Sequence, residues 1–224
     1  MAISIKENVR RVKSKIPGNV KIVAASKYAT AEQIKEAHEA GLKIFGENRV
    51  QDLLQKQEVL SDLPLEWHFI GHLQTNKVKK IIGRVALLHS VDSLKLADEI
   101  SKCSIEIHKK QPILMQVNIS LEATKGGFKP SESLQIARQI ANLEGIELVG
   151  LMSIAPFTSE KDVLEKHFAQ AKRLFNTIKS DLVPGFKWLS MGMSNDFETA
   201  IRYGANLLRL GSIIFRGSYE GHMA

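Results

Sequence analysis

Short apolar runs recur along the whole chain, and each of them ends in a small or polar residue. They occupy residues 20–26, 42–47, 66–71, 86–92, 112–118, 148–154, 188–192 and 207–212. Their length and their content of Val, Ile and Leu are typical of strands that are buried on both faces, as in parallel sheets. The pattern therefore predicts eight parallel strands.

Segments with helical periodicity lie between these runs. One of them begins with Thr30 as an expected N-cap and ends with Gly41 as an expected C-terminal glycine. Strands that alternate with helices indicate parallel pairing through crossover connections. Further helices are expected before residue 20 and over residues 131–145, 159–180 and 194–204.

Eight such units favour the α/β class and a closed (β/α)8 barrel of the TIM type, because closure leaves no sheet edge unpaired. The alternative is an open, doubly wound sheet. Against it, the first predicted strand is followed by Lys27-Tyr28-Ala29-Thr30 and not by a glycine-rich dinucleotide turn. No linker or change of composition divides the sequence, so residues 1–224 are expected to form a single barrel domain.

Composition narrows the functional classes. The single cysteine, Cys103, cannot form an internal disulfide, and the N-terminus carries no signal-peptide or membrane-anchor pattern, so a cytoplasmic location is expected. The net charge of +7 suggests an anionic partner. Nucleic acid is disfavoured because the lysines are dispersed and no RNA-binding signature is present. A phosphorylated small molecule accounts for the charge at least as well.

In a (β/α)8 barrel, functional residues follow the carboxyl ends of the strands. Lys27 follows the first strand, and alternation with Val23 and Ala25 predicts that it faces the barrel interior. There it would lose hydration, which favours the neutral amine that forms a Schiff base with an aldehyde. The alternative is a solvated lysine at a strand end. The full set at the strand ends is Lys27, Asn48, Gly71, Asn118, Ser153, Ser194, Arg209, Gly211 and Ser212.

The last two strands predict a phosphate site. Ser194 is expected at or near the N-cap of the helix over 194–204, with Asp196 in its first turn, so the backbone N–H groups there could bind an anion. Gly211 and Ser212 follow the eighth strand, and the loops after strands 7 and 8 commonly hold phosphate in this architecture. Strands 8 and 1 are neighbours in a closed ring. A ligand with a phosphate and an aldehyde fits this arrangement, and pyridoxal 5′-phosphate is the foremost candidate.

At these residues the sequence resembles the YggS/PROSC family of pyridoxal-phosphate-binding homeostasis proteins, which are relatives of the alanine racemase barrel. The resemblance covers nearly the whole chain. It rests on AASK (24–27), FGENRVQ (45–51), WHFIGHLQTNK (67–77), GLMSIAP (150–156), LSMGMSNDFETAI (189–201) and RLGSIIFRG (209–217).

The resemblance implies a role for each site residue. Lys27 would carry the cofactor as an internal aldimine, and Arg209 would approach the pyridine nitrogen. An arginine there disfavours protonation of the ring, which makes the ring a weaker electron sink. The remaining implied contacts are the ring pocket, from Asn48 and Ser153, and the phosphate, from Ser194, Gly211, Ser212 and backbone donors near Met193.

The racemase relatives add a β domain that supplies a catalytic tyrosine. Only GSYEGHMA (217–224) follows Arg216 here, and Tyr219 is not expected to serve as a base. Storage, delivery or buffering of the cofactor is therefore favoured over catalysis, with an amino-acid racemase or lyase as the alternative. A monomer is expected, and enzymes that depend on the cofactor are candidate partners.

Two histidines and a loop lysine are further features of the sequence. His68 and His72 lack a zinc-site pattern, so they are expected to pack or to hydrogen-bond near the barrel mouth, and no metal site is expected. Lys125 lies in a flexible TKGGFKP turn (124–130). It is expected to be a solvated loop lysine, although contact with a second cofactor molecule stays open.

Overall fold

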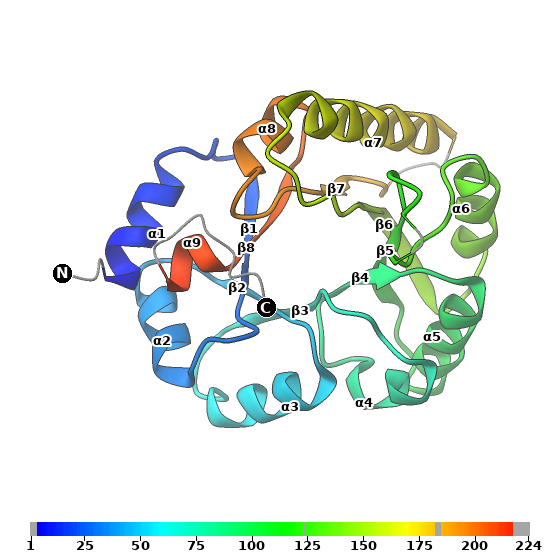
Figure 1. Ribbon diagram of the computed structural model, residues 1–224. Helices are drawn as coiled ribbons and strands as arrows, with labels where there is room; N and C mark the ends of the chain where they lie inside the picture. Colours follow the sequence, from blue (N-terminus) through cyan, green and yellow to red (C-terminus); the bar gives the residue numbers. More distant parts are fainter. Residues whose placement is uncertain (1–3, 123, 182–184, 217–224) are drawn as a thin grey trace.

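The computed structural model describes residues 4–122, 124–181 and 185–216. Within them, eight parallel strands pair in chain order and close when β8 pairs with β1, so the predicted barrel is confirmed. Figure 1 shows the helices as a ring around these strands. The strands are β1 (Lys21–Ala25), β2 (Ile44–Glu47), β3 (Glu66–Phe69), β4 (Leu87–Val91), β5 (Gln111–Gln116), β6 (Ile146–Met152), β7 (Trp188–Ser190) and β8 (Leu207–Leu210).

The helices follow the predicted alternation, with different boundaries in places. The described helices are α1 (Ile5–Lys13), α2 (Ala31–Glu39), α3 (Val50–Val59), η1 (Thr75–Lys77), α4 (Val78–Ile81), α5 (Leu94–Glu106), α6 (Ser133–Ala141), α7 (Lys161–Asp181), α8 (Phe197–Arg202) and α9 (Ser212–Phe215). Thr30 caps α2 in a reciprocal capping box with Gln33, and Gly41 has a φ of 92°, as the sequence predicts.

The helix predicted over 131–145 is shorter than expected. It begins at Ser133, with Glu132 in the N-cap position, and it ends at Ala141. The Glu132 carboxylate accepts a hydrogen bond from the backbone N–H of Lys129 instead of capping the helix. A turn therefore replaces the expected first helical residues.

Two layers of apolar side chains hold the barrel together. The larger cluster lies between the strands and the helices and includes Leu208 and Leu210, whereas Leu207 belongs to a smaller cluster inside the barrel. This alternation along β8 places Arg209 in the interior as well. The smaller cluster consists of Val23, Leu87, Leu114, Val149, Met152 and Leu207.

The first and last described helices support each other. In Figure 1, α1 lies beside α9, and the Asn8 side chain donates a 3.0 Å hydrogen bond to the carbonyl of Ile214. Asn8 is buried, and its contact holds α9 against α1. The loop between β8 and α9 is thereby held in place.

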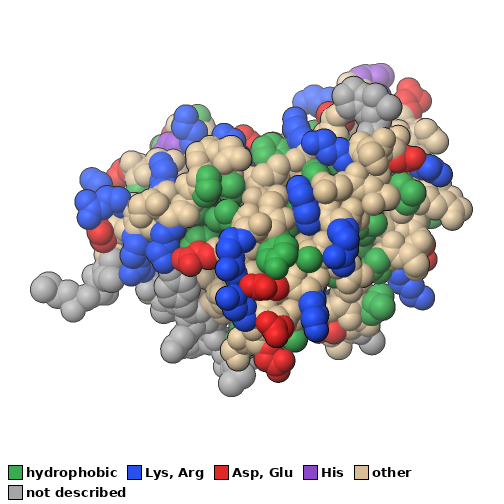
Figure 2. Space-filling model, turned by 90° about the horizontal axis from the view of Figure 1, so that it is seen from above, with side chains coloured by type: hydrophobic (Ala, Val, Ile, Leu, Met, Phe, Trp, Pro, Cys, Tyr) green, Lys and Arg blue, Asp and Glu red, His purple; other side chains and the backbone are tan. Residues whose placement is uncertain are grey.

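The distribution of charged side chains on the surface and the lengths of the helices can be compared with the expectations from composition. Figure 2 shows one face of the molecule, on which Lys and Arg side chains are spread, with acidic and hydrophobic ones between them. Among the residues that the structure describes, no helix combines the length and the apolarity that crossing a membrane requires.

Candidate functional site

Arg209 is the central charged group of the barrel interior. Its guanidinium donates to the Ser190 hydroxyl at 2.7 Å through Nη1 and to the carbonyl of Ser153 at 2.9 Å through Nη2. Burial lowers the pKa of Arg209 to about 10, while the charge of Asp196 acts to raise it. The guanidinium is therefore still charged at neutral pH, and the ends of β6, β7 and β8 converge on it.

Ser194 lies near the N-cap of α8, as predicted, but it does not cap that helix. Asp196 is the N-cap residue of α8. The Ser194 hydroxyl oxygen instead accepts from the backbone N–H groups of Gly211, at 3.3 Å, and Ile213, at 3.4 Å. Gly192, with a φ of 94°, gives the β7–α8 loop the turn that directs Ser194 toward β8.

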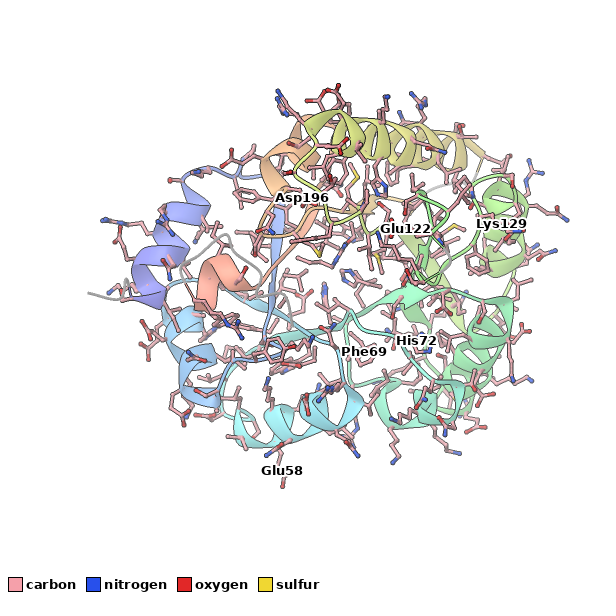
Figure 3. The ribbon with its side chains drawn as sticks, viewed as in Figure 1. Glu58, Phe69, His72, Glu122, Lys129 and Asp196 are labelled. Carbon is pink, nitrogen blue, oxygen red and sulfur yellow. The ribbon has the colours of Figure 1, made fainter. Side chains whose placement is uncertain are left out.

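Of the backbone donors near Met193 that the resemblance implies, the N–H of Met193 itself is already engaged. The N–H of Met193 donates to Asp196 Oδ1 at 2.6 Å. Asp196 is buried, and burial raises the pKa of its carboxyl group. Figure 3 shows Asp196 on the inner side of the helix ring, at the beginning of α8. In the β8–α9 loop, the oxygen of Ser194 marks the position of an acceptor at the N–H groups of Gly211 and Ile213.

Lys27 is exposed, so the prediction that its amine is shielded inside the barrel is wrong. The strand β1 ends at Ala25, and Lys27 and Tyr28 lie in the turn that follows, where strand alternation no longer applies. The amine lies 4.4 Å from the centre of the Tyr28 ring, and its hydrogen bond and charge lower the pKa of the Tyr28 phenol. Lys27 is nevertheless on the correct rim, because Ala25 lies against Gly211.

That contact is close. A Cβ atom added to Gly211 would stand 3.1 Å from the carbonyl oxygen of Ala25 and 3.4 Å from its Cβ. The β1 strand end and the β8–α9 loop are therefore direct neighbours, as the closed ring predicts. The closed barrel therefore brings Lys27 to the same side of the barrel mouth as the loop residues Ser194, Gly211 and Ser212. These three residues are called the Ser194 cradle below.

A buried ion pair beneath the Lys27 turn was not foreseen from the sequence. Glu47 is fully buried, and its Oε1 accepts from Lys56 Nζ at 2.7 Å and from the Ser26 hydroxyl at 2.6 Å. Lys56 also donates to the carbonyl of Ser26 at 2.7 Å. These contacts fix the residue before Lys27 from both its side chain and its backbone. The available signal was a glutamate that ends an apolar strand, with a lysine on the next helix.

The interior histidines form a second feature that sequence reasoning underestimated. His68 lies inside the barrel and bonds to His89 at 3.0 Å, and His89 in turn bonds to Ser190 at 3.1 Å. His72, in contrast, is at the mouth and bonds to Asp92 at 3.2 Å. The expectation that these histidines pack or hydrogen-bond near the mouth is thus met by His72, whereas His68 is buried deeper. The sequence signal for these hydrogen bonds was the presence of polar residues at inward strand positions.

The other predicted residues either lie at the strand ends near the site or stabilise the loops around it. Asn48 follows β2 and is partly buried; a Cβ added to Gly71 would stand 2.1 Å from its carbonyl oxygen. Gly71 therefore permits the β2 and β3 ends to approach each other. The Ser153 hydroxyl bonds to Nε2 of His167 at 3.3 Å. Asn118 donates to two carbonyl oxygens of its own loop and so stabilises that loop.

Lys125 is not the freely solvated lysine that was expected. Its amine bonds to Glu122 at 2.6 Å and to the carbonyl of Ala155 at 3.2 Å, and only 21% of the side chain is exposed. It thereby ties the β5–α6 loop to the segment after β6. Glu122 and His72 both lie within the ring of helices in Figure 3. Tyr219 lies outside the described residues, so the expectation for it stays a prediction.

The arrangement fits pyridoxal 5′-phosphate in three respects. The Ser194 hydroxyl and the N–H groups of Gly211 and Ile213 supply donors for a phosphate, and Ser212 adds a further hydroxyl beside them. Arg209 offers a buried cation toward a ring nitrogen. Lys27 supplies a primary amine at the neighbouring strand end. Among the described residues, no group of three or more His, Cys, Asp or Glu side chains is placed to hold a metal ion.

A cavity of about 380 Å³ lies elsewhere on the molecule, between the segments that follow β3 and β4. Its lining includes His72, Asp92 and Lys95. These residues belong to the opposite part of the strand order from β1 and β8. The cavity is therefore separate from the cradle.

Known proteins share much of this sequence. The sequence matches the family described as alanine racemase, N-terminal domain, over residues 3–218. It is 47% identical to a pyridoxal phosphate homeostasis protein of Helicobacter pylori over 199 residues, which cover 88% of this chain and 87% of that protein. With the protein of the same name from Aquifex aeolicus it shares 42% identity over 195 residues, or 87% of this chain and 86% of that protein.

A solved structure is also similar over most of its length. PipY of Synechococcus elongatus with PLP bound has a TM-score of 0.87 and 33% sequence identity, and the match covers 95% of this chain and 100% of that chain.

Proposed function

The chain belongs to the family of pyridoxal phosphate homeostasis proteins, and from this premise we propose that it binds pyridoxal 5′-phosphate at the barrel mouth through a Schiff base on Lys27. The observation that carries the proposal is the convergence of β8 and β1. Arg209, the Ser194 cradle and the strand end that precedes Lys27 meet there.

The phosphate would bind the cradle of Ser194, Gly211 and Ser212. A phosphate oxygen would replace or accompany the Ser194 hydroxyl at the N–H groups that now donate to it. The pyridine nitrogen would face Arg209, and the edges of the ring would lie between the segments of Asn48 and Ser153. Met193, which is 37% exposed, would cover the phosphate side from the β7–α8 loop.

The amine of Lys27 would attack the aldehyde carbon, form the C=N bond and release water. Because Lys27 is exposed, its reactivity depends on its position beside the cradle and on the water that leaves when the ligand binds. The ion pair of Glu47 and Lys56 supports this position, because it fixes Ser26 directly before Lys27.

We further propose that the protein stores or delivers the cofactor and does not catalyse efficiently. A charged Arg209 disfavours protonation of the ring nitrogen, which weakens the ring as an electron sink. Enzymes that require the cofactor would be the partners, and the protein would act as a monomer of one barrel domain in the cytoplasm. Rapid exchange of the α-proton of an amino acid in heavy water would favour the racemase or lyase alternative.

The test is the absorbance of the purified chain after incubation with the cofactor and removal of excess. The wild type should show an imine band at ~420 nm, and borohydride should fix the added mass on Lys27. Lys27→Ala should lose both signals. Lys35→Ala, which removes an exposed lysine of α2, is the matched control and should keep them. A band of unchanged intensity in Lys27→Ala would overturn the assignment of Lys27.

A further inference from the structure

A line of hydrogen bonds crosses the barrel interior from its floor to Arg209. It begins at Glu66, the first residue of β3, whose side chain is 50% exposed, and Glu66 Oε1 lies 2.9 Å from His68 Nε2. His68 Nδ1 lies 3.0 Å from His89 Nε2, and His89 Nδ1 lies 3.1 Å from the Ser190 hydroxyl. Arg209 Nη1 donates to the same hydroxyl at 2.7 Å.

The residues of this line come from four different strands. His68, His89, Ser190 and Arg209 all occupy inward positions, and each of them is almost fully buried. The line therefore spans the interior of the closed barrel, where an unpaired polar atom costs the most. Its two ends differ in kind, because one end is a cation in the candidate site and the other is a carboxylate that reaches solvent.

The two charged ends determine the direction of every bond between them. Arg209 can only donate, so the Ser190 oxygen accepts from it. The hydrogen bond from His68 lowers the pKa of Glu66, which therefore accepts as a carboxylate from His68 Nε2–H. Burial, together with the charge of Arg209, places the pKa of His89 well below its usual value, so His89 is neutral and has one N–H.

One arrangement then satisfies every atom with both rings neutral. Ser190 donates its O–H to His89 Nδ1, His89 Nε2–H donates to His68 Nδ1, and His68 Nε2–H donates to Glu66. In the reverse arrangement, His89 and Arg209 would both direct an N–H at the Ser190 oxygen. The buried O–H of Ser190 would then have to turn away from His89 and lose that acceptor.

We propose that His68 and His89 are positioning residues for Arg209, because their one-directional line of hydrogen bonds keeps the Ser190 hydroxyl oriented as an acceptor for the guanidinium. The proposal rests on the proposed function in that Arg209 is the residue that faces the pyridine nitrogen. Aligned bonds of this kind polarise one another, so the exposed carboxylate of Glu66 helps to stabilise a buried cation that it does not touch.

The first test uses the unliganded full-length chain. Nitrogen-15 spectra of labelled histidine at neutral pH distinguish ring nitrogens with and without a proton. We expect both His68 and His89 to carry the proton on Nε2 and to have a bare Nδ1. A proton on His89 Nδ1, or protons on both nitrogens of His68, would overturn the proposal. This result does not depend on cofactor binding.

The second test is a double-mutant cycle with pyridoxal 5′-phosphate as the probe. His89→Phe should weaken binding about 3- to 10-fold in the wild-type background, because Ser190 loses its acceptor. In an Arg209→Met background the same change should weaken binding less than about twofold. Equal losses in the two backgrounds would mean that His89 acts only on the fold, and the proposal would fail.

Two further variants provide a control for the double-mutant cycle and a replacement for His89→Phe. His38→Phe replaces a ring on α2 that bonds to the carbonyl of Leu42 at 3.0 Å and is not a member of the line of hydrogen bonds, so it should leave the affinity unchanged. Ser190→Ala should reproduce the loss and the coupling of His89→Phe, and it replaces that variant if the latter does not fold. If the wild type itself does not bind the cofactor, the proposed function fails, and the histidine spectra still decide the direction of the line.

Discussion

Replacing Lys56 by methionine should destabilise the protein through Glu47, which is its buried partner. The substitution removes two hydrogen bonds of 2.7 Å, one to Glu47 Oε1 and one to the carbonyl of Ser26. Glu47 is fully buried, and its Oε2 has no hydrogen-bond partner within the described residues. The variant therefore leaves a buried carboxylate with only the Ser26 hydroxyl. Breaking such a pair from one side costs about 3 kcal/mol of unfolding free energy, at the lower end of measured cases.

Urea unfolding at neutral pH, followed by circular dichroism, measures this change. The midpoint should fall while the slope stays the same, because the area exposed on unfolding hardly changes. The double variant Glu47→Gln, Lys56→Met should recover about 2 kcal/mol, since the buried charge is gone. The control is Lys79→Met, whose amine pairs with Glu106 on the exposed surface, and we expect no measurable change there. A loss below about 1 kcal/mol for Lys56→Met, or a double variant less stable than the single one, would refute the reasoning.

Two other predictions concern the supports of the site. Gly71→Ala should cost about 1–3 kcal/mol of stability, because its Cβ would stand 2.1 Å from the carbonyl oxygen of Asn48, whereas Gly18→Ala meets no atom within 4 Å and should be neutral in the same urea experiment. Burial and the charge of Lys125 lower the pKa of His167 from 6.5 to about 4, so the folded state favours the neutral ring. Stability is then complete above pH ~6.5 and falls by about 2–3 kcal/mol as the pH drops toward 4. His167→Gln should flatten this decline, and an unchanged decline in that variant would contradict the assignment.

The barrel could be predicted because its signal is repeated. Eight apolar runs of strand length, separated by helical periodicity, admit few arrangements, and the closed ring is one of them. The ends of elements were less predictable. Helix α6 begins two residues after Ser131, because Glu132 bonds to Lys129 in a preceding turn. Such local competition between side chain and backbone leaves no periodic trace in the sequence.

The relative positions of the predicted site residues followed from the strand order, whereas their contacts did not. Strand order alone places Lys27, Ser194 and Arg209 on adjoining strand ends. The exposure of Lys27 could not be derived, since β1 ends at Ala25 and alternation gives no direction beyond a strand. The partner of Ser194 depends on the turn at Gly192, which joins residues that are distant in sequence. The ion pair of Glu47 and Lys56 likewise requires the packing of α3 on the barrel.

The turn that carries Lys27 has a kinetic consequence. Because the described residues leave Lys27 exposed, its side chain can reach a ligand by rotating about its own bonds. Side-chain rotation at an exposed position takes picoseconds to nanoseconds, whereas lid opening takes microseconds or longer. Loading from dilute solution would then be governed by molecular encounters and by the bond-forming step. Release to an acceptor could likewise proceed while the barrel stays rigid.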